Sequence, residues 1–343
     1  MTCRRVLYTS YPRFGLDDGG LQRQVQETAK AISRKGVEVA WLDPWRNQLG
    51  EVDLLHVYSL DGSCLSHVQH ASATGIPVVV SPVFNAMQGS WRWHRLRAVA
   101  AGRIPGAYTD LVRAREILAC AKLVVCLNEP EAELIQKVFR VDYARIRIVP
   151  NGIDSRFSAA SPQLFRDKYN LRPSDGFVLN VGRITNIKNQ LMLIESARTG
   201  DIPLIIIGAP SPGQERYWKR CQDALGPNTR MLDPIDYDDP MLPSAYAAAA
   251  VFALPSRSEV MPLVLDEAAS GGCTLVVSSN VPLRSEYLGN VFRVDSASVN
   301  GWSRALRSAL EQSRQTGNRI PPVVYSWDRV GSDILRVYSE AES

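Results

Sequence analysis

The sequence lacks the cysteine spacing of a zinc site or a disulfide framework. Its 343 residues contain six cysteines, scattered along the chain without a CxxC pair. Thiols arranged in this way are typical of a protein that stays in a reducing compartment, and we expect a cytoplasmic location. Hydrophobic residues make up 45% of the chain and charged residues 22%, which is the composition of an ordinary globular protein.

Long hydrophobic runs are also missing. No apolar segment approaches the roughly 18 residues that cross a membrane. The opening residues, MTCRRVLYTSYP, carry two arginines but neither the apolar segment nor the small-residue cleavage site of a signal peptide. We therefore expect neither a membrane span nor a leader.

Several nucleotide and hydrolase motifs are absent too. No GxGxxG follows the early apolar runs, and neither GxxxxGK[ST] nor GxSxG occurs. These absences argue against a dinucleotide oxidoreductase, a P-loop protein and a serine hydrolase of the α/β type. The sequence has no repeated RNA-binding aromatic motif and no strongly basic domain, so we expect no nucleic-acid partner.

What the chain does show is a regular alternation of short apolar runs with helical patterns. In the first half the expected strands are RRVLYTS, VEVAWLD, DLLHVYS, PVVVSPV, KLVVCLN and RIRIVPN. In the second half they are FVLNVGR, PLIIIGA, TRMLD, AVFALPS and TLVVSS. This alternation predicts an α/β protein whose parallel sheets are covered by helices on both faces.

A break between the two series lies at residues 150–162, PNGIDSRFSAASP, which are rich in turn-forming residues. It predicts two tandem doubly wound, Rossmann-like domains, the first spanning residues 1–152 and the second residues 153–326. Ligands of such domains bind beyond the carboxyl ends of the strands, so we expect the two domains to face a central cleft.

Two glutamates in PSRSEVMPLVLDEAASGG, residues 255–272, lie eight positions apart. Proline is accepted in a first helical turn and the glycine pair ends a helix, so we expect a helix over residues 262–270. Glu259 then lies in the loop after a strand, and Glu267 lies on the second turn of the helix. From the spacing alone, an exposed loop acid and an exposed helix acid are the favoured interpretation.

The first turn of that helix offers free N–H groups near Leu263 and Val264, between the two acids. An anion with hydroxyl groups on either side would satisfy all three features, and a sugar–diphosphate–nucleoside is such a ligand. In VGRITNIKN, Arg183 and Lys188 likewise follow a strand and precede a helix. Arginine offers a planar fork to phosphate and lysine a compact charge, although a basic loop pair alone is usually just solvated.

Together these motifs resemble the retaining GT-B glycosyltransferases of family 4. The matching positions are a glycine pair after the first strand, an NG[IV]D junction, a GR…K loop and the paired glutamates: Gly19 and Gly20; residues 151–154; Gly182, Arg183 and Lys188; Glu259 and Glu267. The closing stretch YSWDRVGSDILRVYSE resembles the family's C-terminal helix, which crosses back to the first domain. We therefore expect residues 327–343 to form that helix.

The resemblance implies a role for each matching position. Arg183 and Lys188 would neutralise the leaving nucleoside diphosphate, and Glu259 would hydrogen-bond hydroxyls of the transferred sugar. Glu267 would bind the ribose hydroxyls. The remaining donor-binding positions would act through their backbone: Gly19, Gly20, Gly182, Leu263 and Val264.

The implied reaction is hexosyl transfer with retention, in which donor and acceptor react on one face of the sugar, assisted by the leaving phosphate. No protein nucleophile is required, so Glu259 is not given that role. Cationic side chains and helix N-termini would replace a metal ion, and we expect no metal and no cofactor beyond the nucleotide-sugar substrate. Asp236-Tyr237-Asp238 matches the DxD pattern of metal-dependent glycosyltransferases, but we interpret it as a solvated loop.

Two positions depart from the family pattern. Val83 stands where the family has a histidine that contacts the donor sugar, and Asn85 is our candidate for a replacement sugar or acceptor contact. His56 is expected to be a strand-end histidine in a polar contact. In MLDPID, the glycine that the family more often has near the base pocket is missing.

Basic residues concentrate in the first 150 residues, with 19 Lys and Arg against 14 Asp and Glu. Within them, aromatic and cationic side chains alternate at Trp91, Arg92, Trp93, Arg95 and Arg97. One hypothesis is that this stretch docks on an anionic membrane, on the inner face, beside a lipid-linked acceptor. The alternative is that the tryptophans are packed in the core and the arginines are solvated.

The function expected from these residues is transfer of a sugar from a nucleoside-diphosphate sugar to a glycan or lipid-linked acceptor, in cell-surface polysaccharide assembly. One alternative is a non-catalytic sugar-nucleotide-binding subunit of a glycan-assembly complex. Another is a phosphorylase or a sugar-phosphate synthase of related architecture.

Overall fold

The computed structural model describes residues 3–12, 14, 19–43, 45–46, 49–85, 109–287, 291–316 and 325–343. The chain divides into two compact units. Unit 1 comprises Met1–Gly152 and Tyr325–Ser343, and unit 2 comprises Ile153–Val324. The Trp and Arg stretch at residues 91–97 lies outside the described residues.

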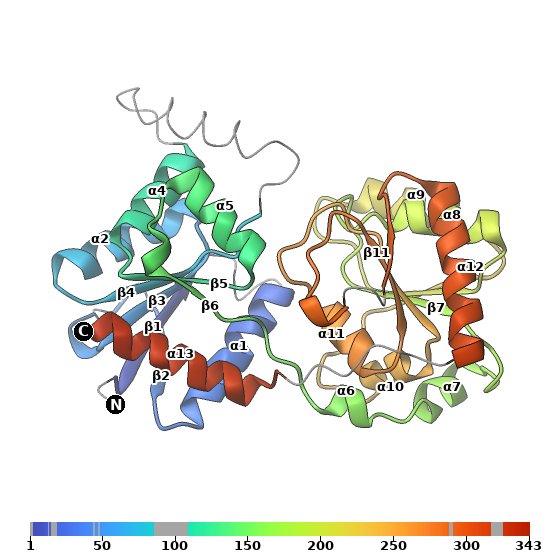
Figure 1. The fold of residues 1–343 in the computed structure, drawn as a ribbon, viewed down its shortest axis with the longest axis horizontal. Helices are drawn as coiled ribbons and strands as arrows, with labels where there is room; N and C mark the ends of the chain where they lie inside the picture. Colours follow the sequence, from blue (N-terminus) through green and yellow to red (C-terminus); the bar gives the residue numbers. More distant parts are fainter. Residues whose placement is uncertain are drawn as a thin grey trace. The chain divides into compact units, whose positions relative to one another are not determined.

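Unit 1 is built on a parallel six-stranded sheet with the order β2-β1-β3-β4-β5-β6 (Figure 1). Its strands are β1 (Arg5–Ser10), β2 (Glu38–Trp41), β3 (Leu54–Tyr58), β4 (Val78–Ser81), β5 (Leu123–Cys126) and β6 (Ile146–Ile148). Its α-helices in the described part of the chain are α1 (Gly20–Ser33), α2 (Leu65–Ala73), α4 (Asp110–Cys120), α5 (Glu129–Phe139) and α13 (Trp327–Glu342). Short 3₁₀ turns are η2 (Leu49–Glu51), η3 (Gly62–Cys64) and η4 (Tyr143–Arg145).

Helices cover both faces of this sheet. Figure 1 shows α1 and α13 on one side and α2, α4 and α5 on the other. Alternate strand residues such as Leu55 and Val57 pack with the α2, α4 and α5 side chains in one buried cluster. All five residues of β3 are buried, as expected for a strand covered on both faces.

The C-terminal helix α13 is fixed to unit 1 by a buried polar network. The hydroxyl of Tyr338 shares hydrogen bonds with the hydroxyl of Tyr8 (3.0 Å) and with Nδ1 of His56 (2.7 Å). Nε2 of His56 lies 2.9 Å from Oγ of Ser81. Burial lowers the pKa of His56 to about 3, so the imidazole is neutral at physiological pH. His56 does make the polar contact expected of it, but from inside β3 rather than at its end.

The glycine of the NGID junction has a packing reason. A Cβ added to Gly152 would lie 2.5 Å from the backbone nitrogen of Trp327, the first residue of α13. Only a residue without a side chain lets the helix start so close to the junction. The junction and the start of the C-terminal helix therefore meet within unit 1.

Unit 2 contains a second parallel six-stranded sheet, with the order β12-β11-β10-β7-β8-β9. Its strands are β7 (Val178–Val181), β8 (Leu204–Ile207), β9 (Thr229–Leu232), β10 (Val251–Leu254), β11 (Thr274–Ser278) and β12 (Val291–Val294). Its helices are α6 (Arg156–Ala159), α7 (Gln163–Tyr169), α8 (Gln190–Gly200), α9 (Glu215–Asp223), α10 (Met241–Ala248), α11 (Leu263–Ser270) and α12 (Val299–Thr316), with the 3₁₀ turn η5 (Ser285–Tyr287).

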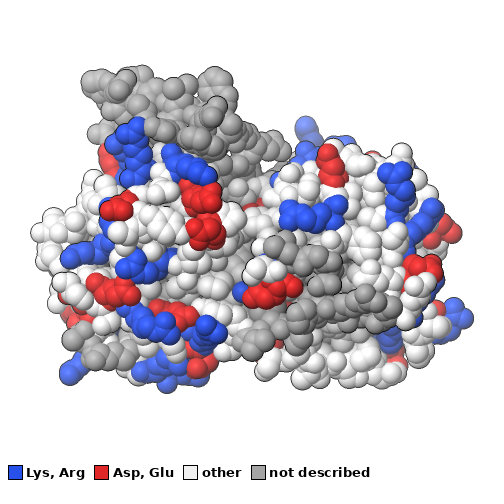
Figure 2. Space-filling view, viewed as in Figure 1, with Lys and Arg blue, Asp and Glu red and all other residues white. Residues whose placement is uncertain are grey.

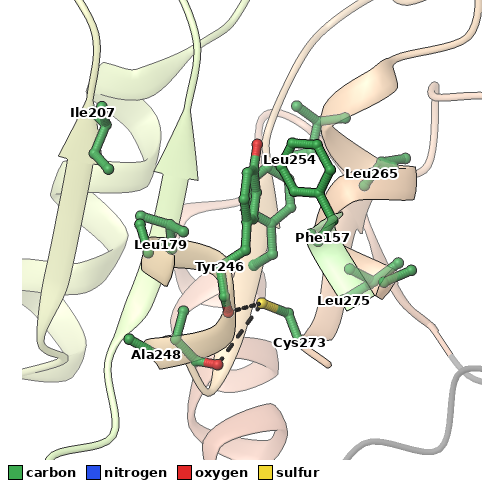
Figure 3. Packing of buried hydrophobic residues seen from close by; sticks show 14 of the residues in the cluster. Phe157, Leu179, Ile207, Tyr246, Ala248, Leu254, Leu265, Cys273 and Leu275 are labelled. Carbon is green, nitrogen blue, oxygen red and sulfur yellow. Dashed lines mark hydrogen bonds between the residues drawn. The ribbon is translucent and has the colours of Figure 1, made fainter. Parts of the chain in front are cut away.

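Each face of this sheet has its own core. On one face α6, α7, α10 and α11 bury residues such as Phe157, Tyr246 and Leu265 against the strands (Figure 3). On the other face α8, α9 and α12 bury Leu193 and Trp302. The expectation of two doubly wound Rossmann-like domains is confirmed, and the helix expected over 262–270 is α11.

The surface in Figure 2 carries acidic and basic side chains interspersed with one another, so the described residues on this face form no extended basic field. Within the described part of the chain, no helix combines the length and the apolar composition needed to cross a membrane.

Candidate active site

The loop after β7, residues 182–189, is built on a contact between two glycines. Gly182 and Gly208 have φ values of 147° and 155°, which favour glycine. A Cβ added to Gly208 would lie 2.0 Å from the carbonyl oxygen of Gly182. The loops after β7 and β8 therefore pass too closely for any side chain at Gly208, a residue that the sequence analysis missed.

Arg183 lies exposed in this loop. Its carbonyl oxygen accepts a hydrogen bond from Nε2 of Gln190, the buried first residue of α8 (2.9 Å). Among the described residues, no carboxylate lies within ion-pair distance of its guanidinium. The backbone at Arg183 is thus fixed by α8 while its side chain extends into solvent, which suits capture of an anionic ligand.

Lys188 and Glu259 come from different loops and meet directly. Nζ of Lys188 lies 2.6 Å from Oε1 of Glu259, and the two side chains are 30% and 12% exposed. The interpretation of Glu259 as an exposed loop acid is therefore wrong. A carboxylate this far removed from water is stabilised by a charge-assisted hydrogen bond of this kind.

The helix α11 begins four residues after Glu259 in the chain. Its N-cap residue is Pro262, and Leu265 donates the first hydrogen bond of the helix to the carbonyl oxygen of Pro262 (3.1 Å). The N–H groups of Leu263 and Val264 precede that bond and have no acceptor within the helix. Leu263 is buried and Val264 is partly buried, so the helix start itself is held in the fold.

Glu267 is also buried, with 5% of its surface exposed, which contradicts its interpretation as an exposed helix acid. The hydroxyl of Tyr246 donates to Oε2 of Glu267 (2.7 Å). Burial, together with the Glu267 carboxylate, raises the pKa of Tyr246 well above its ordinary value, so the hydroxyl remains a donor. The sequence analysis missed Tyr246, because its partner is 21 residues away in the chain.

The neighbouring acid, Asp266, has a different and structural arrangement. Nε of Arg284 lies 3.0 Å from each carboxylate oxygen, Nη2 lies 2.7 Å from Oδ2, and the hydroxyl of Tyr287 donates to Oδ1 (2.7 Å). Asp266 is 2% exposed. This buried set ties α11 to η5, and the adjacent acids Asp266 and Glu267 on an apolar helix were the only signal of it in the sequence.

In unit 1 the glycine pair lies at the start of α1. Gly19 is the N-cap residue in extended conformation, and Gly20 is the first residue of the helix. A Cβ added to Gly20 would meet no described atom within 4 Å. Local packing thus gives no reason for glycine at this position, and its donor-binding role stays a prediction.

The turn after β4 contains Val83, the residue at the family's histidine position. Val83 has a φ of 44°, a strained conformation for a β-branched residue. The N–H of Phe84 donates to Oε1 of Glu131 and the N–H of Leu127 donates to Oε2, both at 2.7 Å. Glu131 therefore fixes the turn that leads to Asn85, which is partly buried; no sugar or acceptor contact of Asn85 is tested by the structure.

Glu131 was missed in the sequence, although Asn128 and Glu131 have the spacing of a capping box. Asn128 is the N-cap of α5, and its side chain accepts from the N–H of Glu131 (2.9 Å). Burial raises the pKa of Glu131 to about 7, while the two backbone N–H groups act in the opposite direction.

The two aspartates of the DxD match lie in a loop. Asp236 and Asp238 are exposed, and the ring of Tyr237 between them packs under the guanidinium of Arg156, at 4.1 Å from its centroid. In the described residues, no three His, Cys, Asp or Glu side chains form a group that could hold a metal ion.

The unit 2 candidates therefore gather after the carboxyl ends of β7 and β10. Lys188 and Glu259 are in contact, Glu267 contacts Tyr246 instead, and Arg183 and Gly182 lie in the same loop as Lys188. Gly19, Gly20 and Asn85 belong to unit 1.

Two family models match the chain. One, for glycosyl transferases group 1, matches residues 162–320, and the other, for glycosyltransferase family 4, matches residues 40–157. The D-inositol 3-phosphate glycosyltransferase of Xylanimonas cellulosilytica is 23% identical, over 95% of this chain and 92% of that protein. The protein of the same name from Salinispora tropica is 30% identical over 71% of this chain, but the match spans only 56% of that relative.

Among solved structures, HepE of Anabaena in complex with UDP and glucose has a TM-score of 0.71 and 14% identity, over 98% of this chain and 99% of that chain. At this identity the likeness concerns the fold alone.

Proposed function

Because this chain belongs to the GT-B glycosyltransferases of family 4, we propose that it transfers a sugar, with retention, from a nucleoside-diphosphate sugar to a glycan or lipid-linked acceptor. The proposed setting is cell-surface polysaccharide assembly on the cytoplasmic side of a membrane. The names of two relatives, which mention inositol 3-phosphate, and the UDP and glucose bound in HepE support a nucleotide donor and an acceptor that carries phosphate.

The observation that carries the proposal is the Lys188–Glu259 contact, whose acid lies four residues before the start of α11 in the chain. A departing diphosphate gains negative charge as the sugar bond breaks, and preorganised cations stabilise that charge. The ammonium group of Lys188 would donate hydrogen bonds to both the diphosphate and Glu259. The exposed guanidinium of Arg183 would be the second positive charge near the diphosphate. Glu259 would hydrogen-bond a hydroxyl of the transferred sugar, and the α11 N–H groups would bind the diphosphate.

No protein nucleophile is part of this mechanism. The acceptor hydroxyl would attack from the face that the diphosphate leaves, and a diphosphate oxygen would take its proton. This route gives retention at the anomeric carbon. Because Arg183, Lys188 and a helix N-terminus supply the positive charge, we expect turnover without a divalent metal.

A donor screen tests the proposal. Purified protein is incubated with UDP-, GDP- and ADP-sugars, with and without a chelator, and release of the nucleoside diphosphate is measured. We expect hydrolysis of one class of donor, unchanged by the chelator. Proton NMR at early times, before mutarotation, should show the α-anomer of the sugar released from an α-linked donor. Inverted product would overturn retention, and a requirement for free phosphate as acceptor would indicate a phosphorylase.

The second candidate is a non-catalytic sugar-nucleotide-binding subunit of a glycan-assembly complex. The specific observation in its favour is Val83, an apolar residue in strained conformation where the family has a histidine. Tight binding of a nucleotide sugar without release of product, in the same screen, would favour this candidate.

Contact with an anionic membrane is a further part of the proposal and rests on Trp91, Arg92, Trp93, Arg95 and Arg97. Several arginines near an anionic surface each add about 1 kcal/mol of attraction. Co-sedimentation with anionic vesicles should fall with salt and with replacement of the three arginines by serine. Absence of binding at low salt would leave a soluble acceptor.

A further inference from the structure

Asn189, the residue after Lys188, combines two unusual properties. It has left-handed backbone angles, with φ of 60° and ψ of 31°, and it is 3% exposed. It is the N-cap residue of α8, but its side chain makes no capping hydrogen bond to that helix. Because buried polar groups are hydrogen-bonded, the side-chain amide of such an asparagine is expected to bond groups outside its own helix.

The amide of Asn189 joins three loops. Its Nδ2 donates to the carbonyl oxygen of Ser296 (2.8 Å), after β12, and to that of Pro255 (3.3 Å), after β10. Its Oδ1 accepts from Nε (3.4 Å) and Nη2 (3.3 Å) of Arg257. The side chain thus connects the loop that carries Lys188 with the loop that carries Glu259.

A backbone hydrogen bond runs in parallel with these contacts. The N–H of Arg257 donates to the carbonyl oxygen of Ile187 (2.8 Å). Arg257 lies two residues before Glu259, and Ile187 lies one residue before Lys188. The two loops are therefore joined by residues close to the ion pair, in which Nζ of Lys188 and Oε1 of Glu259 are 2.6 Å apart.

Asparagine meets both requirements of this position. Glycine adopts the left-handed conformation but has no amide, and aspartate has no N–H to donate to two carbonyl oxygens. An alanine would meet neither requirement.

We propose that Asn189 is a positioning residue that holds Lys188 and Glu259 at their catalytic separation. The inference rests on the function proposed above for that pair. Asn189 touches neither donor nor acceptor in this scheme and acts only through the two loops.

The test compares Asn189→Gly with a matched control, Asn170→Gly. Asn170 also has left-handed angles, at the C-cap of α7, and is exposed. Both changes keep the backbone conformation available, and only the first removes the loop contacts. We expect Asn189→Gly to lower kcat by about 10- to 100-fold, as misplacement of catalytic groups does, with a smaller change in donor KM. Asn170→Gly should leave kcat within about twofold.

A double-mutant cycle separates positioning from general destabilisation. In a Lys188→Ala background, Asn189→Gly should cost less than about threefold, because the group that it positions is already gone. Equal losses in both backgrounds would overturn the proposal.

Hydrogen exchange gives a readout that needs no activity. Peptides that cover residues 183–189 and 255–262 should exchange faster in Asn189→Gly than in wild type. In Asn170→Gly the exchange rates of the same peptides should equal those of wild type. Unchanged exchange in Asn189→Gly would overturn the positioning role. If wild type turned over no donor, the proposed function would fail, while the exchange data would still decide how the two loops are held.

Discussion

At the scale of single residues, the three acids around α11 have three different partners. Glu259 meets a cation, Lys188, and Asp266 meets Arg284, whereas Glu267 meets the neutral hydroxyl of Tyr246. An acid compensated by a fixed arginine is structural, since removing either partner would leave a buried charge. Glu267 accepts from a hydroxyl in this structure, and its proposed ligands, the ribose hydroxyls, are donors of the same kind.

The first prediction concerns the cations. Arg183→Ala and Lys188→Ala should each lower turnover by about 100- to 1000-fold, because removing one preorganised donor to developing charge costs about 2.7–4 kcal/mol of barrier. Initial rates with a saturating donor measure this. Lys219→Ala is the control, since Lys219 forms an exposed ion pair with Asp223 at 2.8 Å. Normal turnover of both variants would refute the diphosphate role.

The second prediction separates the glutamates. Glu267→Gln should weaken binding of the free nucleoside diphosphate, because its proposed ligand is the ribose. Glu259→Gln should leave that affinity nearly unchanged and lower kcat, because its proposed ligand is the moving sugar. Calorimetric titration with UDP or GDP, whichever the donor screen selects, measures the first effect. An equal loss of affinity in both variants would contradict the division of roles.

The sequence located the candidate residues on the fold, but it did not predict the residues that hold them in place. Arg183, Lys188, Glu259 and Glu267 were proposed because each follows a strand or lies on a helix that starts there, and their roles stay predictions. Asn189, Tyr246 and Arg284 were not, since their partners lie far away in the chain and no local pattern announces the contact. The burial of Glu259 and Glu267 was also missed, because burial depends on how loops pack.

At the scale of elements, the turn after β4 depends on a buried carboxylate from α5. Glu131 has a pKa of about 7 in the folded protein, raised by burial from an ordinary value of 4.5. The folded state therefore binds this proton more tightly than the unfolded state does. The stabilisation is fully present below about pH 4.5 and is lost as the pH rises through about 7.

The third prediction follows from that sign. The melting temperature of wild type, minus that of Glu131→Gln, should decrease as the pH is raised from about 5 to about 8. Calorimetry at several pH values measures the difference, and the comparison cancels the titration of groups common to both proteins, including the neutral His56. Parallel curves for the two proteins would show that Glu131 does not titrate in this range.

The fourth prediction concerns α13. Tyr338→Phe removes the hydroxyl that bonds both Tyr8 and Nδ1 of His56, and it leaves a buried polar atom without its partner. The free energy of unfolding should fall by about 1–3 kcal/mol. Urea denaturation measures it. Tyr143→Phe, which removes a hydroxyl from an exposed residue of the same unit, should lower the free energy of unfolding much less. An equal loss in both variants would show that the buried network does not stabilise the fold.

Elements were predicted well where they are buried. The eleven apolar runs correspond to β1–β11, but β12, VFRV, was not expected. It is an edge strand of unit 2 that is only partly buried and contains Arg293, so its hydrophobic signal is weak. The helix expected to follow Lys188 begins at Gln190, and Asn189 between them takes left-handed angles that no sequence pattern indicated.

At the scale of the whole molecule, the turn-rich stretch at 150–162 indicated a change of domain, and the boundary between the two units falls at Gly152. The return of the last helix to unit 1 came from the family resemblance alone. No periodicity could supply it, because an amphipathic helix fits many surfaces equally well. Its specific partners are the buried hydroxyl and imidazole of Tyr8 and His56.

Since unit 1 is made from residues 1–152 and 325–343, a ribosome finishes unit 2 before it has made the last helix of unit 1. During that interval the α13 side of the unit 1 sheet is covered, among the described helices, by α1 alone (Figure 1), and Tyr8 and His56 lack their hydrogen-bond partner Tyr338. Exposed apolar surface of this kind is what chaperones bind and what aggregates. Unit 1 is therefore the first unit whose synthesis begins and the second to be completed.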